Sequence, residues 1–135
     1  MNTQRPLPTE GASYELTRTV DDSLMTPAFG KPDIEVLASP AVVYLMEVAS
    51  LTLVEERLPE ELTSVGTGLT FKHLRPSWAG AEILVRATVQ SVSEKRVDLL
   101  VEAFEREKLV ATAEHSRAVV PTRNFTPPAK QEAQR

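Results

Sequence analysis

The 135-residue chain contains no cysteine. Without thiols it can form no disulfide, no thiolate nucleophile and no thiolate-ligated metal site. Histidine is scarce as well, with 2 residues, so no zinc site, which takes three or four nitrogen, sulfur or oxygen ligands, is expected. These absences leave carboxylates, hydroxyls and two histidines as candidates for chemistry.

Positive charge is also in short supply. Lysine and arginine total 15 residues against 19 aspartates and glutamates, which gives a formal net charge of −4. Nucleic-acid-binding domains carry a basic stripe, and because this sequence shows none we expect no nucleic-acid partner. The first residues lack the apolar core of a signal peptide, and no apolar run reaches the ~20 residues that span a membrane. The sequence therefore predicts a cytoplasmic protein without a membrane partner.

The ends of the chain differ from its middle. Residues 1–12 and 126–135 are polar and rich in proline, and we interpret both as flexible tails. Residues 13–125 then form one domain, which is long enough for a single hydrophobic core.

The most apolar segment is SPAVVYLMEVASLTLV, residues 39–54. Ser39 is a residue type favoured at the helix N-cap, and the fixed φ of Pro40 suits the first helical turn. We expect a helix from about residue 40 to 57, ended by Pro59. Because its first turns are apolar nearly all round, this helix should be wrapped by a sheet.

Strand-like runs lie on both sides of this helix. Their alternation of apolar and polar residues is typical of half-buried strands, and short polar connections between the last three favour hairpins. The runs are residues 14–20, 63–74, 80–92, 97–105 and 109–120. Residues 23–38, broken by prolines and a glycine, should form a loop with a short helical turn.

This order of elements predicts the fold. A strand, a loop, a long helix and four antiparallel strands give an α+β hotdog fold, in which a five-stranded antiparallel sheet wraps around one central helix. So small a layer leaves sheet edge and helix flank exposed, which favours a homodimer.

Glu47 is the one carboxylate inside the apolar helix. An unpaired buried carboxylate is costly, so Glu47 either reaches a polar pocket as a structural group or acts as a general base or nucleophile in an apolar cleft. His73 falls on the predicted apolar face of its strand, with Val65 and Phe71. It is either a satisfied core residue or the partner of Glu47.

Four further positions carry weaker signals. Ser39 is explained as an N-cap, yet its hydroxyl also lies at the positive end of the helix, where an oxyanion can be held. His115 and Arg117 share a face of the last strand; we interpret His115 as a solvated or dimer-facing group, whereas Arg117 can bind an anion. Gly66 and Gly68 mark a bulge or a close helix–strand crossing, or allow a backbone amide to approach a substrate carbonyl.

Three segments, VLASPAVVYLMEVASL, TSVGTGLTFKHL and ATAEHSRAVV, resemble the corresponding segments of the fluoroacetyl-CoA thioesterase family of single-domain hotdog proteins. The resemblance covers about residues 14–125. It rests on an ordered set: a hydroxyl residue, a glutamate eight positions later, Gly-Thr, and a histidine seven positions after that glycine.

The resemblance implies a thioester hydrolase without cofactor or metal, with Ser39, Glu47 and His73 as catalytic residues. It also implies that the amide of Gly66 faces the thioester carbonyl and that Arg117 binds substrate. The expected reaction is hydrolysis of a short or small acyl-CoA to the free acid and CoA, in a site between two subunits. Whether the glutamate attacks directly or activates water stays open. Two alternatives are a non-catalytic acyl-CoA-binding hotdog protein with a sensor or resistance role, and a structural dimer module.

Two departures from the family pattern concern specificity. Pro40 stands where the fluoroacetyl enzyme has a glycine, so this position has no amide to donate. Gly30 and Asp33 fall where that enzyme has lid phenylalanines. We therefore expect the loop of residues 23–38 to be open and mobile, and the enzyme to accept several short acyl-CoAs rather than fluoroacetyl-CoA specifically.

Overall fold

The structure is a computed structural model that describes residues 7–125 and 127–128. Most of the two predicted tails lies outside the described residues. The described part of the first tail lies against the sheet, because Pro8 is buried and the amide of Gly11 donates a hydrogen bond of 2.9 Å to the Val89 carbonyl.

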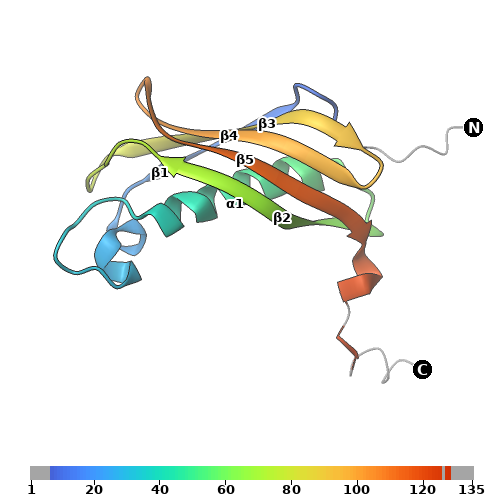
Figure 1. The fold of residues 1–135 in the computed structure, drawn as a ribbon, viewed down its shortest axis with the longest axis horizontal. Helices are drawn as coiled ribbons and strands as arrows, with labels where there is room; N and C mark the ends of the chain where they lie inside the picture. Colours follow the sequence, from blue (N-terminus) through green and yellow to red (C-terminus); the bar gives the residue numbers. More distant parts are fainter. Residues whose placement is uncertain (1–6, 126, 129–135) are drawn as a thin grey trace, which may run out of the picture.

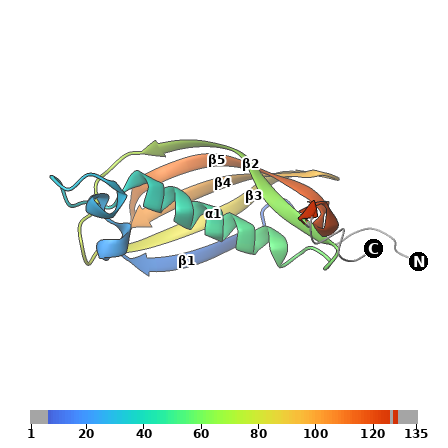
Figure 2. The ribbon, with the colours of Figure 1, turned by 90° about the horizontal axis from the view of Figure 1, so that it is seen from below.

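The described residues form a five-stranded antiparallel sheet that curls around a long helix (Figures 1 and 2). The helix and strands are β1 (Ser13–Thr19), α1 (Ser39–Glu55), β2 (Leu62–His73), β3 (Glu82–Ser93), β4 (Arg96–Glu105) and β5 (Lys108–Pro121). The order across the sheet is β1-β3-β4-β5-β2, so β1 and β2 are its edges. The predicted α+β hotdog architecture is confirmed, and the helix ends two residues earlier than expected.

The core lies between α1 and the concave face of the sheet. The strand alternation predicted for β3 is confirmed, since its inward residues are almost inaccessible and its outward ones are not. Burial of each large aliphatic side chain contributes about 1.5–3 kcal/mol to this packing. The buried core residues of α1, β3 and β4 are Ala41, Val42, Leu45, Met46, Ala49, Leu53, Val54, Ile83, Val85, Ala87, Val89, Val97, Leu99, Val101 and Ala103.

The segment between β1 and α1 forms the wall of a cavity at the start of the helix. It contains two short 3₁₀ turns, Asp22–Leu24 and Thr26–Phe29, where the sequence predicted a single helical turn. The hydroxyl of Thr26 donates to the Ile34 carbonyl (2.6 Å), and Met25 pairs with Leu37 in an isolated bridge. The two ends of this segment are therefore fixed to each other, while its middle stays exposed.

Strand β2 contains a β-bulge that the sequence analysis suspected but did not place. The pairing of β2 with β5 shifts between Gly66 and Gly68, so Thr67 is an extra residue. The prediction that Val65 shares a face with Phe71 and His73 is therefore wrong. The residues that face α1 are Leu62, Ser64, Gly66, Leu69, Phe71 and His73.

Candidate active site

The first polar centre lies at the start of α1. Ala38 occupies the N-cap position, and no side chain caps the helix there, so the predicted N-cap role of Ser39 is wrong. Ser39 is instead the first helical residue, which leaves its hydroxyl free for other partners. Its Oγ lies 2.8 Å from Nδ1 of His73, the last residue of β2.

His73 is held in an environment that disfavours its charged form. Burial lowers the pKa of His73 below its ordinary value of 6.5, and the nearby backbone of Arg75 only partly opposes this effect. Its Nε2 atom is buried and has no hydrogen-bond partner among the described residues. The imidazole is therefore neutral near pH 7, with one nitrogen bound to Ser39 and the other unpaired.

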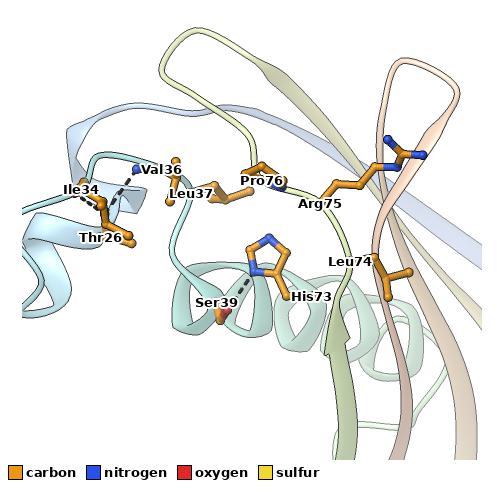
Figure 3. A pocket seen from close by; sticks show the side chains of 9 residues that line it. All are labelled: Thr26, Ile34, Val36, Leu37, Ser39, His73, Leu74, Arg75 and Pro76. Carbon is orange, nitrogen blue, oxygen red and sulfur yellow. Dashed lines mark hydrogen bonds between the residues drawn. The ribbon is translucent and has the colours of Figure 1, made fainter.

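This Ser39–His73 pair borders a cavity of about 340 Å³ (Figure 3). The walls come from the segment before α1, the helix start and the segment that follows β2. Figure 3 shows the side chain of Arg75 extending away from Ser39 and His73. The lining residues are Thr26, Ile34, Val36, Leu37, Ser39, His73, Leu74, Arg75 and Pro76.

The second polar centre surrounds Glu47, in the middle of α1. Its Oε1 atom accepts a hydrogen bond of 2.7 Å from Nη1 of Arg117 and lies 2.8 Å from Nε2 of His115. The predicted pairing of Glu47 with His73 does not occur within one chain, where the partners of Glu47 are Arg117 and His115. Glu47 lies beside Gly66, and His73 is seven residues farther along β2.

His115 is a buried residue whose surroundings the sequence analysis misjudged. Its side chain is buried and not solvated as expected. Nδ1 lies 2.8 Å from the Gly68 carbonyl oxygen, which only accepts, so Nδ1 carries a proton. Nε2 lies 2.8 Å from Oε1 of Glu47 and 3.2 Å from Nη1 of Arg117, so the imidazole is held between the carboxylate and the guanidinium.

Arg117, on β5, completes this centre. Its Nε donates to Oγ of Ser64 (2.9 Å) and its Nη2 to the Ser64 carbonyl (3.2 Å). Burial lowers the pKa of Arg117, and the charges of Glu47 and Glu55 oppose this shift. With its side chain 6% exposed and its donors engaged by the protein, Arg117 supports Glu47. This placement argues against the expected direct contact with CoA.

Gly66 is required for the approach of β2 to the helix. A Cβ atom at this position would lie 3.0 Å from Oε2 and 3.2 Å from Oε1 of Glu47, and 3.2 Å from Cε1 of His115. A side chain would therefore push against the carboxylate and the imidazole. Both structural interpretations of the glycine pair, a bulge and a close crossing, are confirmed.

A single chain keeps the two centres apart. Ser39 and Glu47 are eight residues apart on α1, about 12 Å along the helix axis. Glu47 does not line the cavity that contains Ser39 and His73. The three predicted catalytic residues therefore lie in two separate centres. Ser39 and His73 lie at the N-terminal end of α1, and Glu47 lies at its middle.

Residues 7–125 and 127–128 contain no group of three or more His, Cys, Asp or Glu side chains placed to hold a metal ion. Among the same residues, no helix is long and apolar enough to cross a membrane.

Solved structures show the class to which this fold belongs. A hot-dog-like protein from Thermanaerovibrio acidaminovorans is similar with a TM-score of 0.80 and 25% identity, covering 93% of this chain and 90% of that chain. A thioesterase from Haemophilus influenzae is similar with a TM-score of 0.70 and 27% identity, covering 82% and 73%. The protein is a hotdog-fold thioester hydrolase.

The particular family follows from a family model. The model described as FlK, fluoroacetyl-CoA-specific thioesterase, matches residues 20–123, and the chain belongs to this family. A mutant of the fluoroacetyl-CoA-specific thioesterase FlK, in complex with fluoroacetate and CoA, is similar with a TM-score of 0.77 and 24% identity, covering 87% of this chain and 99% of that chain. No curated protein gives a significant match.

Proposed function

We propose that the protein hydrolyses short acyl-CoA thioesters, with Glu47 as the general base and Ser39 as the donor to the thioester carbonyl. The observation that carries this proposal is the asymmetric environment of the Glu47 carboxylate. Oε1 is held by Arg117 and His115, whereas Oε2 has no hydrogen-bond partner among the described residues. The side chain is 43% exposed, so Oε2 is fixed in direction and accessible to water.

A homodimer would join the two centres that a single chain separates. α1 exposes an apolar stripe that includes Tyr44, 56% exposed, and Leu51, 39% exposed. Packing two α1 helices antiparallel around a two-fold axis near Val43 sets Ser39 opposite Glu47 of the partner subunit, because Val43 lies midway between them in sequence. β2 is an edge strand of the sheet, and its free edge supplies a second surface for the same pairing.

The reaction then uses the groups in order. Neutral His73 donates a hydrogen bond from its Nδ1–H to Oγ of Ser39, which leaves the Ser39 hydroxyl to donate a hydrogen bond to the thioester carbonyl oxygen. Oε2 of Glu47 takes a proton from water, and the hydroxide adds to the carbonyl carbon. The carbon–sulfur bond breaks, the carbonyl re-forms, and the CoA thiolate receives the proton from Oε2. One water is consumed, and the products are the acid and CoA.

The acyl group occupies the cavity beside Ser39. Ile34, Val36 and Leu37 give this cavity an apolar wall, and its volume of about 340 Å³ suits a small acyl chain. Phenylalanine is absent from its described lining, and Phe29 is exposed on the adjacent turn. These features support the expectation of several short acyl-CoA substrates over specificity for fluoroacetyl-CoA.

A panel of acyl-CoA thioesters, assayed by release of the free thiol, tests the proposed activity. We expect turnover of acetyl-CoA and its short homologues, and no strong preference for fluoroacetyl-CoA in direct competition. Saturable acyl-CoA binding without thiol release would instead establish the non-catalytic acyl-CoA-binding protein.

Mixed dimers test the site between subunits. Ser39→Ala and Glu47→Gln chains are each expected to keep no more than about a tenth of the wild-type activity alone. After co-refolding, random pairing should restore about one quarter of the wild-type activity, because half of the dimers then contain one intact site. No recovery in dimers shown to be mixed would place the whole site within one chain.

A further inference from the structure

A second hollow lies next to the Ser39–His73 cavity and has a different character. It has a volume of about 320 Å³ and shares two lining residues, Arg75 and Pro76, with that cavity. The segment that follows β2 is thus the common wall of both hollows. The complete lining is Arg75, Pro76, Trp78, Glu105, Arg106, Lys108 and Val110.

The charged side chains that line this hollow are mostly positive, whereas the whole protein is negative. Arg75, Arg106 and Lys108 face one carboxylate, Glu105, although the chain carries a formal net charge of −4. Among the described residues, none of the three cations forms a salt bridge. The hairpin between β4 and β5 presents two of them, and Arg106 reaches its place in the turn with a φ of 58°. The hollow is therefore a local site for anions.

Trp78, the only tryptophan of the chain, forms the aromatic wall of this hollow and is 60% exposed. The segment that carries it is nevertheless fixed. The Ser77 carbonyl accepts from the Leu37 amide (2.8 Å), and the amide of Gly80 donates to the Val20 carbonyl (2.9 Å). Ser77 itself is buried. An exposed indole on a fixed segment, beside cations that form no salt bridge among the described residues, is a surface on which a planar ring can stack.

We infer that this hollow binds the phosphorylated adenosine end of CoA. Trp78 stacks on the adenine, while Arg106, Lys108 and Arg75 bind the 3′-phosphate and the diphosphate. The pantetheine arm then crosses Arg75 and Pro76 and delivers the thioester to Ser39. This assignment rests on the proposed function and deepens it, because it selects a CoA thioester over a thioester that lacks the nucleotide.

Tryptophan fluorescence tests the site without any reliance on catalysis. Because Trp78 is the only tryptophan, titration of the wild-type protein with adenosine 3′,5′-bisphosphate reports on this hollow alone. We expect saturable quenching that weakens as salt rises. The Arg106→Ala/Lys108→Ala variant should lose it, and a matched Lys72→Ala/Lys95→Ala variant, which removes two exposed cations elsewhere, should keep it. Unchanged fluorescence in the wild-type protein would overturn the inference.

Kinetics provide the second arm. In the Arg106→Ala/Lys108→Ala variant, we expect the KM for acetyl-CoA to rise by about tenfold or more through the loss of charge-assisted contacts, with kcat unchanged. The KM for acetyl-pantetheine, which has no nucleotide, should not change. Equal effects on both substrates, or an effect confined to thioesters of an acidic carrier protein, would overturn the inference. Nucleotide quenching without turnover of any thioester would refute the proposed activity and leave this site standing.

Discussion

The two histidines of the chain stand in opposite surroundings. His115 is bound at both ring nitrogens, by the Gly68 carbonyl and by Glu47, and Arg117 lies beside it. His73 is bound at one nitrogen by Ser39, and its other nitrogen is buried without a described partner. His115 can therefore hold the Glu47 carboxylate in place. His73 keeps one unpaired nitrogen among the described residues, and its burial favours the neutral imidazole.

The comparison assigns different tasks to the two ends of the site. The Glu47 centre is a network of charges in which each group restrains the next, from Glu55 through Ser64 and Arg117 to Glu47. The Ser39 centre is a single neutral hydrogen bond beside an apolar cavity. Removal of charge should therefore be costly at the first centre and mild at the second.

The largest effect is expected from Glu47→Gln. Loss of the general base should lower kcat by about a hundredfold or more, while the amide oxygen still accepts from Arg117. Thiol release gives kcat, and a thermal melt shows that the variant is folded. Adding His115→Gln should lower kcat little further, because the two residues act as one unit. Wild-type activity in Glu47→Gln together with a collapse of thermal stability would make Glu47 a structural carboxylate.

Arg117→Ala should come next. Because Arg117 holds Oε1 and does not face the proposed CoA path, kcat should fall by about tenfold to a hundredfold with little change in KM. The variant should also be less stable, since truncation leaves Ser64 and the two carboxylates without their cation. Kinetics and a melt on the same sample measure both effects. A rise in KM with unchanged kcat would restore the role in substrate binding that the family resemblance implied.

Replacement of Ser39 distinguishes a hydroxyl donor from a packing residue. Ser39→Ala should lower kcat by about tenfold, roughly the weight of one hydrogen bond to a developing charge. Ser39→Thr keeps the hydroxyl and should retain most of the activity, which makes it the matched control. Equal losses in the two variants would show that shape rather than the hydroxyl is what matters at the start of α1.

The smallest effect concerns stability against pH. Burial lowers the pKa of folded His73 below 6.5, so below that pH the unfolded chain binds a proton that the folded chain resists. Stability is therefore lost as pH falls from 6.5 toward the lower pKa of the folded state. Melting temperatures of wild-type and His73→Asn proteins, compared between about pH 7.5 and about pH 5, should converge as pH falls. A constant difference would mean that His73 titrates normally.

The elements were predictable because their signals are repeated many times. The helix carries an apolar run of four turns, and β3 shows a period of two over its whole inward face, so one atypical residue changes neither prediction. The predicted start of α1 was off by one residue, since Ala38 takes the extended N-cap conformation and the hydroxyl of Ser39 pairs with His73 instead of capping the helix.

The pairing inside the site was not predictable in the same way. One extra residue, Thr67, reverses the faces of half of β2, and a stretch with two glycines gives no pattern that would place it. A signal for His115 did exist. On β5 it continues the inward series of Ala111 and Ala113, and small residues on a strand face mark a side pressed against the helix.

The same bulge bears on how the protein behaves at high concentration. β2 is an edge strand of 12 residues, and a long regular edge invites other chains to add strands without limit. The shift at Gly66 and Gly68 breaks that edge into two short ladders that are out of phase. A second copy of the chain can pair with such an interrupted edge in a closed dimer, whereas a fibril needs an uninterrupted edge. The extra residue, Thr67, should therefore also protect the protein against aggregation.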